Sequence, residues 1–193
     1  MSLKVTGGGR LRIIAGRSKG RILESIKGRN TRPTSDKVKE AIFNIIQIRI
    51  PNSLVLDLFA GTGNLGLEAL SRGASKAIFI DRDINAVKTI RKNCYNLGYQ
   101  DHVEIYRNDA ARGLTELSKR DILFDIVFMD PPYAKGYEES LLQLIYEANI
   151  LHNDSIVIVE HDSKTILPDR IAELCRYDFR KYGGTGVSFY RKE

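Results

Sequence analysis

The sequence has few of the residues that form disulfides or bind metals. Of its 193 residues, only two are cysteines and three are histidines. Cys94 and Cys175 lie far apart, without C-x-x-C spacing, and His102, His152 and His161 are scattered singly. This pattern argues against a disulfide framework and a metal site. We expect both cysteines to be small buried hydrophobic residues, and we assign the histidines no chemistry.

Long hydrophobic runs are also missing. No apolar stretch approaches the ~20 residues that a membrane-spanning helix needs, and residues 1–9 lack the apolar segment of a secretory signal. The composition, 42% hydrophobic and 28% charged, is that of a globular protein with one domain, or one domain and a small appendage. We therefore expect a cytoplasmic protein.

The net positive charge of the chain lies in its N-terminal part. Residues 1–49 contain 12 Lys and Arg and 3 acidic residues, a net charge of +9, whereas the remainder contains 18 and 21, a net charge of −3. This asymmetry favours a polyanionic partner for the N-terminal part, although an ordinary solvated basic arm would show the same composition. We predict a basic N-terminal extension over residues 1–50 and an α/β domain over residues 51–193.

The extension has the pattern of a hairpin followed by a helix. Two short strands, 10–15 and 20–26, flank a turn that has glycine at both ends and basic residues at its tip. Hydroxyl residues and Asp36 then predict the start of a helix over residues 36–48.

The rest of the chain alternates short apolar runs with longer helical segments, as expected for a parallel sheet with crossover helices. The predicted strands are 54–57, 77–80, 103–106, 124–129 and 155–160, and the predicted helices are 64–71, 83–97 and 137–148. After Pro168 we expect another helix, and then a closing antiparallel hairpin formed by residues 174–182 and 187–191.

A glycine-rich loop follows the first predicted strand. Gly61, Gly63 and Gly66 match G-x-G-x-x-G between a strand and a helix, and Asp81 lies about 20 residues further on, where an acid can accept hydrogen bonds from ribose hydroxyls. Asp57, at the mouth of the loop, would repel a pyrophosphate. S-adenosylmethionine (SAM) carries an ammonium and a sulfonium instead, so the loop favours SAM over a dinucleotide.

A second motif follows the strand at 124–129. Asp130-Pro131-Pro132-Tyr133 combines a carboxylate and bare carbonyls, which only accept hydrogen bonds, with an aromatic ring in a rigid loop. This combination suits a planar ring that bears an exocyclic amine. The alternative is a turn in which Asp130 caps the next helix.

With D-L-F-A-G-T-G-N-L-G, the acid of the second strand and D-P-P-Y in that order, the chain resembles class I SAM-dependent methyltransferases that modify exocyclic amines. Over its whole length it is similar to the bacterial guanine-N2 methyltransferases of small-subunit ribosomal RNA, whose openings match R-I-I-A-G-R-S-K-G-R and R-P-T-S-D-K-V-K-E-A-I-F-N. The resemblance implies a Rossmann-like α/β fold with a seven-stranded, mostly parallel sheet, SAM as methyl donor and ribosomal RNA or the small ribosomal subunit as partner.

The resemblance and the motifs together give three groups of candidate site residues. We expect the cofactor to be bound by Asp57, Phe59, Ala60, Gly61, Thr62, Gly63, Asp81, Arg82, Asn108, Asp109 and Ala110. The target base is expected to contact Asp130, Pro131, Pro132 and Tyr133. Ribosomal RNA is expected to contact Arg10, Arg12, Arg17, Lys19, Arg21, Arg29 and Arg32.

Other functions share parts of this pattern. An adenine-N6 methyltransferase of DNA or RNA also carries D-P-P-Y, but such enzymes usually have a sizeable target-recognition region, and one helix fills the space after Tyr133 here. Glutamine methyltransferases of release factors carry Asn in place of Asp130. An NAD-linked oxidoreductase would explain only the glycine loop and Asp81, and a non-catalytic RNA-binding module only the basic hairpin.

Overall fold

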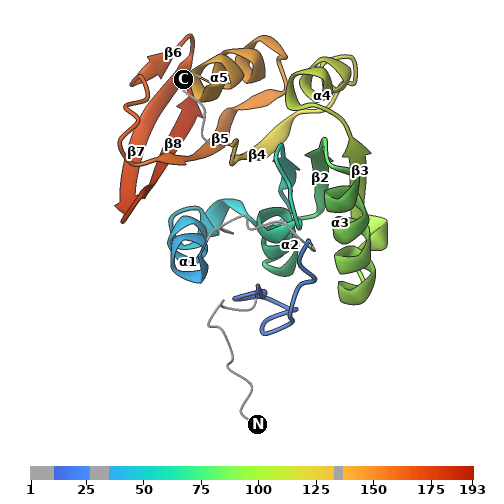
Figure 1. Cartoon of the computed structure of the whole chain (residues 1–193). Coiled ribbons are helices and arrows are strands. Elements are labelled where there is room, and N and C mark those ends of the chain that lie inside the picture. The colour runs from blue at the N-terminus through green and yellow to red at the C-terminus, as the bar shows by residue number, and fades with distance from the viewer. Residues whose placement is uncertain (1–10, 27–34, 133–136) are drawn as a thin grey trace.

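The computed structural model describes residues 11–26, 35–132 and 137–193. Its centre is an eight-stranded mixed sheet in the order β3-β2-β1-β4-β5-β8-β7-β6 (Figure 1). The α/β fold class is confirmed, whereas the predicted count of seven strands is wrong. The additional strand is the short edge strand β6.

Five parallel strands form the first part of the sheet. They are β1 (Leu54–Asp57), β2 (Lys76–Asp81), β3 (Val103–Arg107), β4 (Phe124–Met129) and β5 (Leu151–Asp162). The strand predictions agree with these positions, although β5 extends beyond the predicted residues 155–160 at both ends. Helices connect the strands, as parallel pairing requires: α2 (Asn64–Ser71), α3 (Ile84–Leu97), α4 (Ala110–Leu117) and α5 (Tyr137–Glu147).

The C-terminal part of the sheet is antiparallel. Strand β8 (Thr185–Lys192) pairs with both β5 and β7 (Leu174–Tyr182), and β7 pairs with β6 (Arg170–Ile171). The predicted closing hairpin is confirmed, but the helix predicted after Pro168 is wrong. Ile171 and Leu174 are buried on the sheet, and Ala172 between them adopts a left-handed conformation with φ 49° that turns the chain back.

Helices cover both faces of the sheet (Figure 1). On one face, α1 (Asp36–Ile45), α2 and α3 pack on strand residues such as Val55, Phe128 and Ile158. On the other face, α4 and α5 pack on strand residues that alternate with these in the sequence, such as Val127 and Val159. Because side chains alternate between faces along a strand, β1, β2, β4 and β5 each contribute to both cores, whereas β3 contributes Val103 and Ile105 to the first. No helix in the described residues is long and apolar enough to cross a membrane.

Helix α1 is shorter than predicted. It ends at Ile45 and is followed by a 3-10 turn over Gln47–Arg49. At its start, the Ser35 hydroxyl accepts a hydrogen bond from the Val38 N–H at 3.3 Å, which confirms the predicted capping by a hydroxyl residue.

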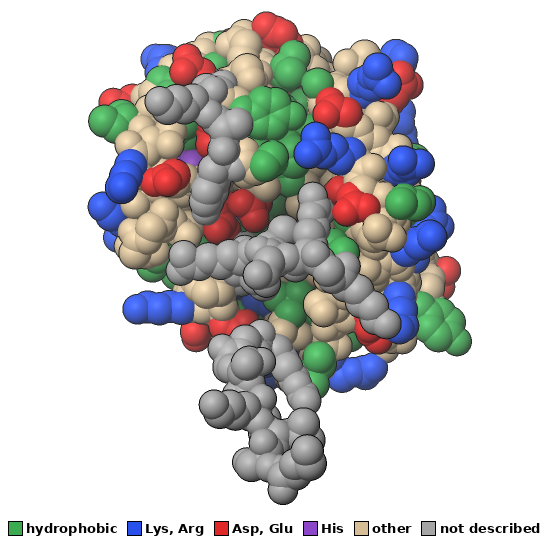
Figure 2. Space-filling model, viewed as in Figure 1, with side chains coloured by type: hydrophobic (Ala, Val, Ile, Leu, Met, Phe, Trp, Pro, Cys, Tyr) green, Lys and Arg blue, Asp and Glu red, His purple; other side chains and the backbone are tan. Residues whose placement is uncertain are grey.

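On the surface seen in the same orientation, Lys and Arg side chains lie mostly along the outline, and Asp and Glu side chains also occur near the middle (Figure 2).

The N-terminal segment 11–26 contains only one isolated antiparallel bridge, between Arg12 and Ile22. Backbone hydrogen bonds also join Ile13 to Arg21 and Leu23 to Leu11, so the two halves of the segment lie side by side as in the predicted hairpin, but they do not form two regular strands within the described residues. The N–H groups of Ile14 and Ala15 instead donate to the Glu68 carboxylate of α2, at 2.8 and 3.0 Å. The segment is thus fastened to α2 rather than paired fully with itself.

The turn of this segment lies directly against the end of α2. Gly16 has φ +80°, and a Cβ there would be 1.8 Å from the Ser71 carbonyl oxygen. The Ser18 N–H donates to the Ser71 hydroxyl at 3.0 Å, and the Ser18 and Tyr99 hydroxyls are 2.8 Å apart. Only glycine fits at this close approach.

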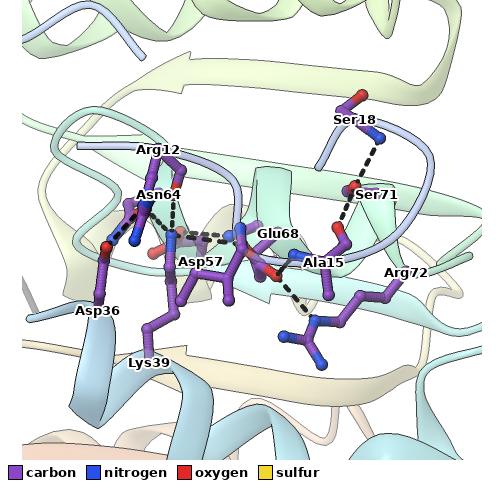
Figure 3. Close-up of polar contacts among 12 residues, drawn as sticks. Arg12, Ala15, Ser18, Asp36, Lys39, Asp57, Asn64, Glu68, Ser71 and Arg72 are labelled. Carbon is purple, nitrogen blue, oxygen red and sulfur yellow. Dashed lines mark hydrogen bonds and ion pairs between the residues drawn. The ribbon is translucent and has the colours of Figure 1, made fainter. Parts of the chain in front are cut away.

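A buried charge cluster joins the segment, α1 and α2 (Figure 3). Lys39 Nζ lies 3.3 Å from Glu68 and also donates to the Arg12 carbonyl and to Asn64 Oδ1. Arg72 Nε donates to the other Glu68 oxygen at 2.8 Å. Burial lowers the pKa of Lys39, and Glu68 opposes that shift. The cluster crosses the predicted boundary at residue 50, so the extension and the α/β domain share a core.

We predict that Glu68→Gln lowers the free energy of unfolding by about 3–5 kcal/mol, because it leaves the buried Lys39 and the partly buried Arg72 without their counter-charge. Urea denaturation measures this change. Glu116→Gln is the matched control, since its ion pair with Lys119 is exposed and should contribute less than about 1 kcal/mol. Equally small effects in both variants would show that Glu68 does not hold the N-terminal segment in place.

Candidate functional site

A cleft of about 1600 Å³ opens at the carboxyl ends of the parallel strands. Ligands bind at this edge in open α/β sheets, because the connecting loops leave a crevice there. The loops after β1, β2, β3 and β4 line the cleft, together with residues 22–26 of the N-terminal segment and the turn between β7 and β8.

The loop after β1 is held by hydrogen bonds to its neighbours. Gly63 precedes α2 with φ 80°, a left-handed conformation that suits glycine. The Gly61 N–H donates to Asp81 Oδ2 at 2.8 Å, and the Gly66 N–H donates to Asp57 Oδ2 at 3.1 Å. Two of the predicted cofactor-binding acids therefore shape the glycine loop themselves.

Asp57 is buried in the floor of the cleft, with 3% of its surface exposed. Burial raises its pKa to about 7, and the nearby Asp81 adds to this effect, while the Gly66 hydrogen bond opposes it. A carboxylate in this position is stabilised by a cation and destabilised by a phosphate. The site therefore fits the ammonium and sulfonium of SAM better than the pyrophosphate of a dinucleotide.

The next two strands end in further acceptors. Asp81 also receives the Asp83 N–H at 2.8 Å, and Asp109 caps α4 by accepting the Ala111 N–H at 3.0 Å. The α4 helix was not predicted, and its capping residue is one of the predicted cofactor residues. Tyr137 of α5 packs edge-to-face on Phe59, with ring centroids 6.1 Å apart. These two rings give the cleft an apolar wall that can hold a flat group.

The loop after β4 places Asp130, Pro131 and Pro132 in the wall of the same cleft. Burial raises the pKa of Asp130 well above its usual value, and Glu160 and Asp57 raise it further. Asp130 is therefore a stronger base than an exposed carboxylate. Tyr133, the fourth residue of the motif, lies outside the described residues.

The cleft brings together most of the predicted site. Apart from Gly63, which shapes the loop, every predicted cofactor residue lines it: Asp57, Phe59, Ala60, Gly61, Thr62, Asp81, Arg82, Asn108, Asp109 and Ala110. Sequence reasoning missed Glu160, Tyr137 and Thr185, which also line it. Glu160 could have been found, because it ends the predicted strand 155–160 as Asp57 and Asp81 end theirs.

The predicted RNA-contacting residues of the N-terminal segment lie outside the cleft. Arg12 forms an exposed ion pair with Asp36, the Arg17 guanidinium lies 4.2 Å from the centre of the Tyr99 ring, and Arg21 donates to the Asn96 carbonyl. Lys19 is exposed, and within the described part of the chain its hydrogen bond is that of the backbone N–H to the Gly16 carbonyl. Arg10, Arg29 and Arg32 lie outside the described residues.

We predict that Asp57→Asn stabilises the protein without ligand at alkaline pH. The pKa of Asp57 is about 7 in the folded protein and about 3.9 in the unfolded chain. The contribution of Asp57 to the free energy of unfolding is therefore fully present below about pH 3.9, and it is lost as the pH rises through about 7. Melting temperatures should differ by several degrees at about pH 8, since each kcal/mol is worth roughly 2–4 °C in a domain of this size.

The difference between the two proteins should shrink toward about pH 5. The exposed Asp121, changed to Asn, is the control and should follow the wild type at every pH. A pH-independent difference for Asp57→Asn would contradict the raised pKa.

Comparisons with known proteins agree with this site. The family model "Conserved hypothetical protein 95" matches residues 11–191. "Putative rRNA methyltransferase YlbH" of Bacillus subtilis is 44% identical over 182 residues, which cover 94% of this chain and 99% of that protein. "Ribosomal RNA small subunit methyltransferase D" of Haemophilus influenzae is 34% identical over 185 residues, covering 95% and 93%.

Solved structures give the same result. The structure of "Putative methyltransferase yhhF" from Escherichia coli superposes with a TM-score of 0.85 at 32% identity, and the match covers 96% of this chain and 99% of that one. These relatives remove the hypotheses of an NAD-linked oxidoreductase and of a non-catalytic module. The chain belongs to the family of "Conserved hypothetical protein 95", a family of SAM-dependent methyltransferases.

Proposed function

We propose that this protein transfers the methyl group of SAM to the exocyclic N2 amine of a guanine in small-subunit ribosomal RNA. The observation that carries the proposal is the shared cleft: the acceptor loop at Asp130 and the acids at Asp57 and Asp81 lie at one edge of the sheet. A methyl donor and an amine bound at these two places would lie side by side. The names of the relatives, which specify ribosomal RNA and its small subunit, support the choice of substrate.

The residues on the β1 side would hold SAM, which supplies an electrophilic methyl group. Asp57 would neutralise the ammonium, and Asp81 would accept hydrogen bonds from the ribose hydroxyls. Asn108 and Asp109 would contact the adenine. Since burial raises the pKa of Asp57, binding of a cation beside it restores the ionised form.

The residues on the β4 side would orient the acceptor. The lone pair of guanine N2 is delocalised into the ring, so the amine attacks poorly unless it is turned. Asp130 and the Pro131 carbonyl would each accept one amine hydrogen, direct the lone pair toward the methyl carbon and stabilise the positive charge that develops on nitrogen. Asp130 would then accept the proton that the methylated nitrogen loses, and its raised pKa suits this role. Tyr133 would stack on the base.

The basic N-terminal segment would hold the RNA backbone. Its residues 22–26 line the cleft, while Arg12, Arg17, Lys19 and Arg21 lie on the same segment. Contacts from these side chains to phosphates give affinity and register without reading the sequence. Among the described residues, α5 is the one helix or strand between Pro132 and the start of β5, which supports RNA over a DNA substrate that needs a large recognition region.

We predict that Asp130→Asn retains SAM binding and loses methyl transfer. The amide can no longer accept the proton, and one of its two polar atoms becomes a donor, so turnover should fall about 100- to 1000-fold. Calorimetric titration with SAM and a methyl-transfer assay on small-subunit RNA measure the two effects separately. Asp101→Asn, at an exposed acid outside the cleft, is the control. Equal losses of binding and turnover in Asp130→Asn would refute its role in orienting the acceptor.

We also predict that the double variant Arg12→Gln, Lys19→Gln weakens RNA binding. The slope of the logarithm of the binding constant against the logarithm of the salt concentration should become shallower by about 1 for each phosphate contact that is lost. SAM affinity should not change. Substitution is preferable to deletion of this segment, because Ile13 and Leu23 belong to the core. Lys119→Gln, on an exposed pair with Glu116, is the control for the loss of an exposed positive charge outside the segment. An unchanged salt slope in the double variant would show that the segment does not contact phosphates.

A further inference from the structure

Glu160 is a buried acid in the cleft for which the proposed function so far has no role. It lies near the end of β5, with 6% of its surface exposed, and it lines the cleft. The register of β4 and β5 pairs Met129 with Val159, so Asp130 and Glu160 are the next residues on adjacent parallel strands. Glu160 is therefore beside the acceptor loop.

The direction of the Glu160 side chain follows from strand alternation. Phe128 and Ile158, two residues before Asp130 and Glu160, both belong to the core on the α1 side of the sheet. Glu160 continues this row, as Asp57 continues the row of Val55 on β1. Its backbone is also paired with Val187 of β8. The carboxylate is thus carried by a strand with neighbours on both sides, which limits its movement.

Two neighbouring carboxylates in a low-polarity cleft repel each other. Glu160 is the strongest charged contributor to the raised pKa of Asp130. In the described residues, no group of three His, Cys, Asp or Glu side chains is arranged to hold a metal ion. A ligand that presents adjacent N–H donors to both carboxylates would stabilise their ionised forms and so offset part of this repulsion.

The Watson–Crick edge of guanine has this arrangement of donors. Its N1–H and its N2 amine lie on adjacent ring atoms, and carboxylates only accept hydrogen bonds. Adenine presents a lone pair at N1 beside its amine, so a carboxylate opposite N1 would face another acceptor. Sites that hydrogen-bond a substrate N–H discriminate strongly against analogues that lack it, because the buried partner is left unsatisfied.

We propose that Glu160 accepts the N1–H of the target guanine while Asp130 holds its N2 amine, so that Glu160 selects guanine over bases with an acceptor at N1. This inference rests on the proposed function and assigns base selection to a residue of the same cleft. It would also explain how a protein whose D-P-P-Y loop can bind either adenine or guanine selects guanine as its target base.

The test compares guanine with 2-aminopurine at the methylated position, after that position has been mapped by mass spectrometry. 2-Aminopurine keeps the amine at C2 but has a lone pair at N1. The wild type should methylate guanine roughly 10- to 100-fold faster than 2-aminopurine. In Glu160→Gln, the rate of methylation should fall by a similar factor on guanine. On 2-aminopurine the rate should fall little or not at all, because the Gln amide can donate a hydrogen bond to N1.

Matched variants separate base selection from a structural effect. Glu160→Asp keeps the carboxylate and should retain the preference for guanine, even if its rate falls. Asp154→Asn removes an exposed acid of the same strand and should behave as the wild type. Calorimetry with SAM and a melting curve check that each variant is folded, and Glu160→Asp carries the test if Glu160→Gln does not fold.

The outcomes distinguish the inference from the proposed function. Equal losses of Glu160→Gln on both bases, or a preference for guanine lost in Glu160→Asp as well as in Glu160→Gln, would overturn the role of Glu160 and leave the guanine methyltransferase intact. A wild type that transfers no methyl group to guanine in small-subunit RNA would overturn the proposed function itself.

Discussion

The cleft depends on the register of the parallel strands. In β1 and β4, Asp57 is aligned with Phe128, and in β4 and β5, Phe128 is aligned with Ile158. Because side chains of aligned residues project from the same face, the acids at or just beyond these strand ends converge on one edge of the sheet. A shift by one residue in any of these strands would turn an acid toward the opposite core. The two hydrophobic cores therefore fix the position of the polar site.

The convergence of acids has a cost in stability and an advantage for binding. Burial and mutual repulsion raise the pKa values of Asp57 and Asp130, which destabilises the folded protein where these groups are ionised. A cationic cofactor and an amine-bearing base would offset both the cost of burying these carboxylates and the repulsion between them. The folded protein should therefore be more stable with these ligands bound than without them, as is common when a functional site contains buried ionisable groups.

The N-terminal segment is coupled to the cleft through helix α2. Glu68 holds the segment by two backbone N–H groups, while Asn64, at the start of the same helix, accepts a hydrogen bond from Lys39 of α1. Helix α2 also carries the end of the glycine loop. RNA held by the basic segment would therefore be positioned against the cofactor loop by one rigid helix.

Much of this arrangement could be predicted from the sequence. Four of the parallel strands are apolar runs that end in an acid or are followed by one, and this pattern predicted the strands together with Asp57, Asp81 and the loop at Asp130. Such a pattern is visible because it involves only residues that are close in the sequence. The connection of Ile14 and Ala15 to Glu68 could not be predicted, since it joins residues more than 50 positions apart. Helix α4 was missed because Asn108 and Asp109 were assigned to a loop at the cofactor site, and β6 because its formation depends on the left-handed Ala172.

The central claim is that the methyl donor and the acceptor amine meet at the Asp130 loop. The most direct measurement is a crystal structure with bound SAM. The account predicts that the sulfonium methyl carbon faces the corner formed by Asp130 and Pro131, with the ammonium toward Asp57. A methyl carbon directed away from that corner would contradict it.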